Sequence, residues 1–392
     1  MTIDFQQVLG QVRQFGEQAL LRELHLISRR QLARDELLKH TSDIDRLKEK
    51  IYGLNIEQKN QLRCGVPLEE PLTTHLPIPS VSKLGTIIAA DGSQVFPDHH
   101  IEVFYGLVNV GAIIMHPLSS EPPITTIQSQ LVYGERLDNL SNNILALYRD
   151  IGERRILVEI AKSQLPPVIT FTDGPMELWI SRDSNNEEKT TYQQALDEYQ
   201  ESLHQLNKMR IITAGYVDKP GANLVVRMLE ITLADNDQLL DLPRYQPFKG
   251  VLDTDLFNHL LAPGERSAIF SIQSPSSVFY QGELSLNFFY VNVSDNNEPW
   301  LARIEIPSWV ASRKPSIDHL HLALVSQCRL MGDKPYPYLL HRAHETAVVT
   351  QSEREQLNQM ILIEMRKQGF PTGKISAKQA AKNFSARKRL MR

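Results

Sequence analysis

Two short apolar stretches, each leading into Asp-Gly, constrain the fold of this chain most. The first covers residues 84–90 and ends in Asp91-Gly92-Ser93; the second covers 168–172 and ends in Asp173-Gly174-Pro175. Each is predicted to be a buried β-strand with a carboxylate at its C-terminal end. If the strands are neighbours in one sheet, Asp91 and Asp173 lie close together, and a divalent cation between them would relieve their repulsion. Asp-Gly between apolar runs is also a hairpin signal, so turn formation explains each copy separately.

Composition is that of a globular protein, because 42% of the 392 residues are hydrophobic and 22% are charged. This length predicts one large domain with appendages, or two domains. Cys64 and Cys328 are the only cysteines, which excludes a disulfide framework and a four-cysteine zinc site. No 18-residue uncharged apolar run and no N-terminal signal sequence are present, so we expect a cytoplasmic protein without a membrane segment.

Charge is distributed unevenly along the chain. Residues 366–392 carry +9 with no Asp or Glu, so the remainder carries −13 against a total of −4. A basic end on an acidic body predicts a local contact with a polyanion, although a solvated terminal tail explains the same composition.

Periodicity divides the chain into four predicted parts. Residues 1–64 form an N-terminal helical segment of two helices, 65–83 a Pro- and Ser-rich linker, 84–350 the main domain, and 351–392 a C-terminal helix with a basic tail. In the main domain, strands are predicted at 84–90, 101–110, 112–114, 168–172, 210–217, 268–273, 286–293 and 300–306. Helices are predicted at 137–164, 187–209, 223–233 and 316–330. This order favours a mixed α/β sheet covered by helices.

Glu153 lies on a predicted helix between the two Asp-tipped strands. It shares the apolar face with Ile156, Leu157 and Ile160, whereas Glu159 is expected to point to solvent. Burying a charged carboxylate costs free energy unless a partner of opposite charge offsets it. That partner would be either a metal shared with the strand-end acids or an arginine in a buried ion pair.

A further cluster of candidate residues occurs near the end of the main domain. Tyr336 lies between two prolines, and His344 follows on a helix that starts beyond Pro337. Histidine acts as ligand, donor or base at neutral pH, which suits it to a position beside a scissile phosphate. His341-x-x-His344 lacks the partners of a zinc site.

Together these motifs resemble the NurA nuclease family over roughly residues 84–350. The resemblance rests on the strand ending in Asp91-Gly92-Ser93, the helix with Glu153, the strand ending in Asp173-Gly174, and the order of three later segments. Those segments are Val217-Asp218-Lys219, the run 300–307, and the Tyr-Pro…Ala-His pattern of Tyr336, Pro337, Ala343 and His344. The family's usual Ser before the Lys is Asp218 here, and Glu159 is the fallback for Glu153.

The resemblance implies an RNase H-like mixed sheet and a homodimer. It also implies a nuclease site built from Asp91, Glu153, Asp173, Tyr336 and His344. The metal implied for this site is Mn²⁺, with Mg²⁺ as the other possible ion. It further implies a 5′–3′ exonuclease and single-strand endonuclease that processes DNA ends in double-strand break repair with a HerA-type hexameric ATPase. The chain itself has no Gly-x-x-x-x-Gly-Lys-Ser/Thr motif with which to bind ATP.

The chemistry of phosphodiester hydrolysis suits these residue types. Asp91 is expected to bind both of two metal ions, with Asp173 and Glu153 holding one each, and His344 to bind or orient at the leaving-group side. Tyr336 is expected to position a phosphate or a ligand. Lys219, Arg227 and Arg303 are candidates for contacts with DNA phosphates. The alternative is a catalytically inactive DNA-binding or adaptor subunit of an ATPase complex, which keeps the fold without the activity.

Overall fold

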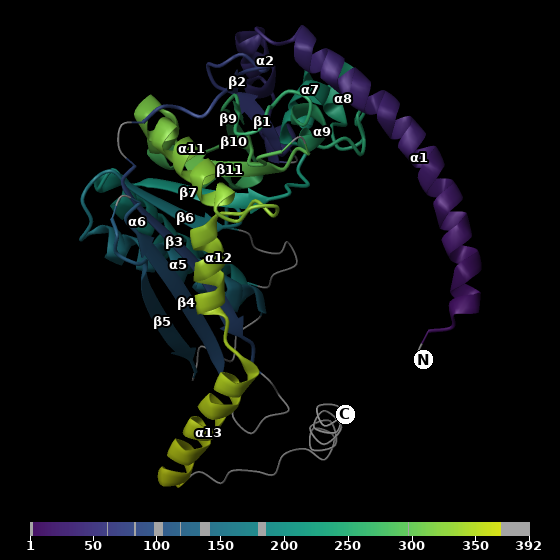
Figure 1. The fold of residues 1–392 in the computed structure, drawn as a ribbon. Helices are drawn as coiled ribbons and strands as arrows, with labels where there is room; N and C mark the ends of the chain where they lie inside the picture. Colours follow the sequence, from purple (N-terminus) through teal and green to yellow (C-terminus); the bar gives the residue numbers. More distant parts are fainter. Residues whose placement is uncertain are drawn as a thin grey trace. The chain divides into compact units, whose positions relative to one another are not determined.

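The computed structural model describes residues 3–60, 62–81, 84–97, 105–117, 119–133, 142–178, 186–296 and 298–369. They form two compact units, each assembled from separate stretches of chain (Figure 1). The first unit contains residues 1–83, 174–177 and 214–337, and the second contains 84–173, 178–213 and 338–392. Strand β7 (Ile212–Asp218) begins in the second unit and ends in the first.

The first unit begins with the long helix α1, which covers Phe5–Lys39. Two helices were predicted for residues 1–64, whereas the described part of this segment contains the 35-residue α1 and two short helices. The C-terminal half of α1 packs on its own unit through Arg30, whose Nε lies 2.9 Å from Asp255 Oδ1. The other helices are α2 (Ile44–Tyr52), α3 (Ile56–Asn60), α7 (Leu224–Leu233), α8 (Asn236–Leu240), α9 (Asp253–Phe257), α10 (Ser308–Ala311) and α11 (Lys314–Arg329), with 3-10 turns η1 (Pro275–Val278) and η2 (Gly282–Leu284).

Strands of the first unit follow the order β1-β9-β10-β11-β7, all antiparallel. They are β1 (Cys64–Pro67), β9 (Phe270–Gln273), β10 (Leu286–Asn292) and β11 (Leu301–Pro307), with the short pair β2 (His75–Leu76) and β8 (Arg266–Ser267). Two stacked ring pairs, Phe257 with Tyr290 and Phe270 with Phe288, lie in the core and meet edge-on through Phe288 and Tyr290. Because β1 pairs with β9, residues 65–67 are part of the sheet and not of the predicted linker.

Strands of the second unit follow the order β5-β4-β3-β6. They are β3 (Thr86–Val95), β4 (Gly106–Met115), β5 (Ile124–Val132) and β6 (Val168–Asp173). The first three are antiparallel neighbours, and β6 is parallel to β3. This mixed sheet, flanked by helices, confirms the predicted mixed α/β fold class. The two strands predicted over 101–110 and 112–114 are the single strand β4 within the described residues.

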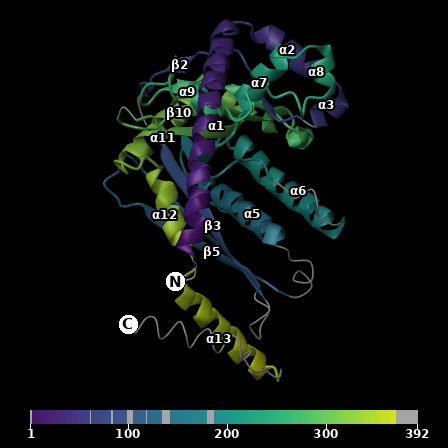
Figure 2. The same cartoon turned by 90° about the vertical axis from the view of Figure 1, so that its right-hand side faces the viewer.

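Helices α5 (Asn142–Ala161) and α12 (Tyr338–Ala347) cover opposite faces of this sheet (Figures 1 and 2). Successive side chains of β3 point alternately toward α5 and toward α12. A Cβ at Gly92 would meet Arg149 and Glu153 of α5, and one at Gly111, which pairs with Asp91, would meet Ala343 of α12. Helix α6 (Asn186–Lys208) packs on α5, and α13 (Gln351–Lys367) packs against the cluster formed by Val95, Tyr105 and Leu107.

No helix in the described part of the chain is long and apolar enough to span a bilayer. Of the predicted basic tail, Arg366 and Lys367 belong to α13, and residues 370–392 lie outside the described residues.

Candidate active site

Asp91 and Asp173 are in-register neighbours on adjacent parallel strands. The β3–β6 register ends with the pair Ala90 and Thr172, so the next residue on each strand is the aspartate. Such residues project from the same face about 4.8 Å apart. The condition stated from the sequence, that the two strands are neighbours in one sheet, is therefore met, and neither Asp-Gly is a hairpin turn.

The position of Asp91 within its strand corrects the sequence prediction. Strand β3 does not end at residue 90 but continues to Val95, so Asp91 lies in mid-strand, where Gly111 of β4 pairs with it. Asp173 is the last residue of β6, and Gly174 follows with a φ of +86°, which glycine adopts without steric cost. Asp91 is 9% exposed, whereas Asp173 is exposed.

His344 contacts Asp91 directly. Its Nδ1 lies 2.7 Å from Asp91 Oδ2. Because an ionised carboxylate only accepts hydrogen bonds, Nδ1 carries the proton and Nε2 is left with a lone pair. The His344 side chain is 62% exposed, so Nε2 is accessible from solvent. The sequence suggested both residues for the site but could not show that one orients the other.

Helix α12 holds His344 over the sheet by backbone contacts. The carbonyl of Ala347 accepts hydrogen bonds from Ser93 Oγ at 2.5 Å and from Asn109 Nδ2 at 2.8 Å. The absence of a side chain at Gly111 lets the helix come close, since a Cβ there would lie 2.8 Å from the Ala343 carbonyl oxygen. Strand-borne groups thus fix the end of the helix that carries the imidazole.

Glu153 is buried on the inner face of α5, as predicted, and is 6% exposed. Arg149, one turn earlier, places Nε 3.6 Å from Glu153 Oε1 and donates from NH2 to Asp150 Oδ1 at 2.7 Å. The second option from the sequence, compensation by an arginine, is therefore present in the structure. Gly92 makes room for this group, because a Cβ there would lie 3.0 Å from Glu153 Oε1.

Protonation of the acids on α5 is altered by their surroundings. Burial raises the pKa of Glu153 well above its ordinary value, and the charge of Asp150 raises it further. Burial also raises the pKa of Asp150, although Arg149 opposes this shift. A nearby cation would favour the ionised form of both groups.

A buried arginine that the sequence analysis overlooked lies next to Glu153. Arg154 is 2% exposed, and it donates from Nε to the Tyr199 hydroxyl at 3.1 Å and from NH1 to Thr213 Oγ1 at 3.4 Å. Arg149 could have been found from its i, i+4 spacing to Glu153. Arg154 could not, because its partners come from α6 and β7.

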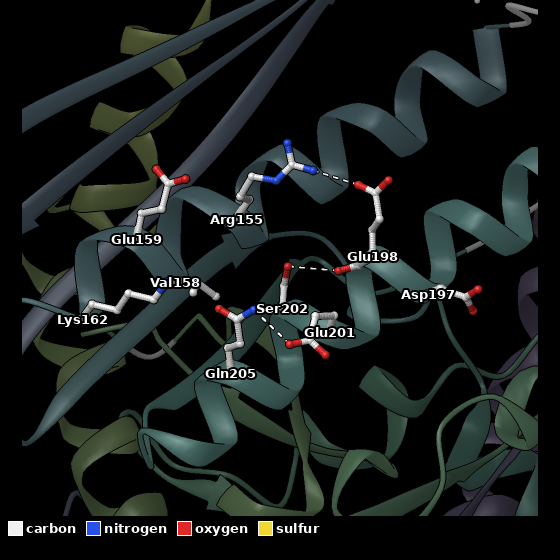
Figure 3. A pocket seen from close by; sticks show the side chains of 9 residues that line it. All are labelled: Arg155, Val158, Glu159, Lys162, Asp197, Glu198, Glu201, Ser202 and Gln205. Carbon is white, nitrogen blue, oxygen red and sulfur yellow. Dashed lines mark hydrogen bonds and ion pairs between the residues drawn. The ribbon is translucent and has the colours of Figure 1, made fainter.

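Glu159 points away from this site. It is exposed and accepts a hydrogen bond from Gln128 Nε2 at 2.5 Å. Figure 3 shows it on the rim of an open groove between α5 and α6, where Arg155 pairs with Glu198 at 2.8 Å. This groove lies along the outer face of α5 and contains none of the predicted catalytic residues.

The remaining predicted residues belong to the first unit. The ring of Tyr336 meets that of Tyr216 edge-on, with centroids 5.4 Å apart. Arg227 is 9% exposed and pairs with Glu230 at 2.6 Å, and Arg303 is 6% exposed and pairs with Glu305 at 2.8 Å. Buried guanidinium groups with internal partners are not available to a DNA backbone, so the structure gives no support for the predicted phosphate contacts of Arg227 and Arg303. Lys219 is exposed.

The donor types on β3, β6, α5 and α12 suit a hard divalent cation. Carboxylate oxygens of Asp91, Asp173 and Glu153, with the imidazole of His344, are ligands that Mn²⁺ and Mg²⁺ sites use. The side chains are arranged as pairs: within the described residues, no three His, Cys, Asp or Glu side chains already surround one point. Holding a metal therefore requires Asp173 to turn toward Asp91. Glu153 lies on the opposite face of the sheet, beside Gly92, so it would have to reach the metal from that side.

Comparison with known proteins identifies one family. The model of the NurA domain matches residues 85–349, which confirms the resemblance drawn from the motifs. No protein with curated annotation matches the sequence.

Solved structures that this chain matches include the NurA nuclease from Sulfolobus solfataricus, with 13% identity and a TM-score of 0.45 over 85% of this chain and 97% of that one. A NurA crystallised with manganese has 11% identity and a TM-score of 0.39 over 81% and 95% of the two chains. The catalytic domain of human endonuclease V has 13% identity and a TM-score of 0.33 over 74% and 86%.

Proposed function

This chain belongs to the NurA family of nucleases, and we propose that it is a divalent-metal-dependent deoxyribonuclease whose site is built on Asp91, Glu153, Asp173 and His344. One observation carries the proposal. Asp91 pairs in register beside Asp173 on one side and contacts His344 on another, so two carboxylates and an imidazole share one face of the sheet. This combination binds hard cations and moves protons.

His344 is suited to proton transfer. Asp91 fixes the tautomer that has the proton on Nδ1, and the exposed Nε2 can take a proton from an attacking water or, once protonated, give one to the leaving oxygen. The Asp91 carboxylate stabilises the imidazolium in that exchange. Tyr336, eight residues before His344 in sequence, is proposed to position the phosphate or a ligand.

The metal is proposed to be Mn²⁺, with Mg²⁺ as the other candidate, held by Asp91, Asp173 and Glu153. His344 would be a fourth ligand in place of proton transfer and not together with it, because its Nε2 has a single lone pair. Bound there, it would neutralise charge on the phosphate oxygens and acidify water. A NurA structure solved with dAMP and manganese supports this choice of ion and of DNA as substrate. The positive charge of the metal would offset the buried negative charge of Glu153, as Arg149 does in this structure.

A direct assay tests this proposal. Purified full-length protein is incubated with end-labelled linear DNA in Mn²⁺, in Mg²⁺, in Ca²⁺ and in EDTA. We expect digestion in Mn²⁺, less or none in Ca²⁺, and none in EDTA. Asp91→Asn should lower the rate at least about 100-fold while the protein stays folded. Glu159→Gln, on the outer face of the same helix, is the matched control and should cut at the wild-type rate.

A second candidate function is a catalytically inactive DNA-binding or adaptor subunit. The ion pair of Glu153 with Arg149 favours it, since a scaffold without metal needs an internal partner for that carboxylate. The two functions separate in the same assay: an adaptor binds DNA but leaves it intact with every cation.

Partners of the chain are proposed from the family and from α1. We propose a homodimer that works with a HerA-type hexameric ATPase in the cytoplasm, acting as a 5′–3′ exonuclease and single-strand endonuclease in DNA end resection and break repair. The N-terminal half of α1 supports a protein contact, because Phe5, Val12 and Phe15 lie on one side of the helix and are 64%, 55% and 67% exposed. Co-purification of the ATPase with the wild-type chain, and its loss with Phe15→Glu, tests this contact.

A further inference from the structure

Lys219 has an unusual backbone conformation. Its φ is +40°, a value that side-chain-bearing residues rarely adopt, and Pro220 follows it. A proline restricts the residue before it to extended conformations, so two local preferences are violated at once. Residues held in such conformations cluster where a side chain has a defined task.

The side chain of Lys219 is fixed by an aromatic ring. Its Nζ lies 3.8 Å from the centroid of the Trp300 ring. The indole is fixed in turn, because Trp300 Nε1 donates to Asp218 Oδ1 at 2.8 Å. Register supports this geometry, since Ala302 of β11 pairs with Asp218 of β7 and brings the start of one strand beside the end of the other.

The ammonium group of Lys219 has donors to spare. Among the described residues it forms no ion pair, and the ring face occupies one side of it only. Lys50 of the same unit differs, because its ammonium group donates to the carbonyls of Thr232 and Ala234 at 2.7 and 2.6 Å. Lys219 is therefore an exposed, oriented cation with capacity for an external anion.

We propose that Lys219 and Trp300 form a subsite for one backbone phosphate of DNA, in which Lys219 binds the phosphate and Trp300 and Asp218 are positioning residues. This inference rests on the proposed function. The proposed substrate, DNA, is a polyanion, and one of its backbone phosphates is a ligand that this exposed cation fits.

The test measures binding without hydrolysis. Affinity of the full-length protein for a fluorescent single-stranded oligonucleotide is measured in EDTA over a salt series. Lys219→Ala should weaken binding and reduce the slope of log K against log salt by about 0.7, the value for one phosphate contact on a single strand. Lys219→Arg should restore most of the affinity. Lys314→Ala removes another exposed lysine of this unit, one paired with Asp318, and is the matched control.

The proposed role of Trp300 in orienting the Lys219 ammonium group can be tested separately. Trp300→Leu keeps every charge, yet should weaken binding nearly as much as Lys219→Ala, and the double variant should be little worse than either single one. Replacing one linkage at a time by a neutral methylphosphonate should reveal one position at which the wild type loses affinity and Lys219→Ala does not.

Two outcomes would overturn the inference: an unchanged slope in Lys219→Ala, or a Trp300→Leu variant that unfolds at lower temperature but binds DNA normally. The second would make the pair a support of the β7–β11 contact only. These outcomes are distinct from failure of the proposed activity. If wild-type protein leaves DNA intact in Mn²⁺ while Lys219→Ala still loses affinity, the subsite stands and the nuclease proposal falls.

Discussion

The imidazole of His344 contacts the carboxylate of Asp91, with Nδ1 2.7 Å from Oδ2, although 253 residues separate them in sequence. This relationship ties α12 of the second unit to strand β3, at the point where Asp173 ends the neighbouring strand β6. It gives the candidate site an oriented imidazole before any substrate is present.

His344→Ala should lower turnover on DNA about 100- to 10,000-fold, the range for loss of a general acid or base, with a much smaller effect on DNA affinity in EDTA. Single-turnover kinetics and fluorescence anisotropy separate the two effects. His341→Ala, one turn earlier and paired with Glu345, is the control and should cut at the wild-type rate. Equal losses of affinity and turnover would make His344 a DNA-binding residue rather than a proton carrier.

Glu153→Gln should abolish activity and yet raise the melting temperature of the metal-free protein at pH 8. Because burial raises the pKa of Glu153, the folded protein binds this proton more tightly than the unfolded chain. Ionisation above the ordinary glutamic acid range therefore costs stability, and that cost grows as pH rises. Glutamine removes the cost, so the difference from wild type should disappear near pH 4. A melting temperature that falls at pH 8 would show that the ion pair with Arg149 stabilises the fold.

Gly111→Ala should destabilise the protein by about 1–3 kcal/mol in urea unfolding and lower activity. The new Cβ would lie 2.8 Å from the Ala343 oxygen and 2.9 Å from the Ala347 nitrogen, both backbone atoms of the helix that carries His344. Gly221→Ala, where nothing lies within 4 Å, is the control. Full activity in a destabilised Gly111→Ala would mean that catalysis does not depend on the position of α12.

His321 should make folding stability depend on pH. Burial lowers the pKa of His321 from 6.5 to about 4, and its Nε2 lies 2.7 Å from the carbonyl oxygen of Gly264. Between these two values the unfolded chain binds a proton that the folded protein does not, so stability rises with pH by up to about 1.4 kcal/mol per pH unit. Urea titrations from pH 4 to pH 7 should show this slope, and His321→Gln should reduce it. Identical slopes would assign the pH dependence to other groups.

Sequence patterns located several of these features because the signals were local. The apolar run before Asp173 and the helical spacing around Glu153 predicted a strand end and an inward carboxylate that the structure contains. The extension of β3 was missed because Gly92 and Ser93 are typical of a turn, and only pairing with β4 makes them part of a strand. The burial of Arg303 could not be predicted from the sequence, because its partner Glu305 becomes buried only when β11 joins the sheet.

Binding of Mn²⁺ tests the central claim most directly, because it does not depend on catalysis. Isothermal titration should show that the wild-type protein binds Mn²⁺, and that Asp91→Asn and Asp173→Asn each lose most of this affinity, as does the double variant. Glu159→Gln should bind as tightly as the wild type. Unchanged Mn²⁺ binding in both single aspartate variants would contradict the account, because the metal would then lie away from the paired ends of β3 and β6.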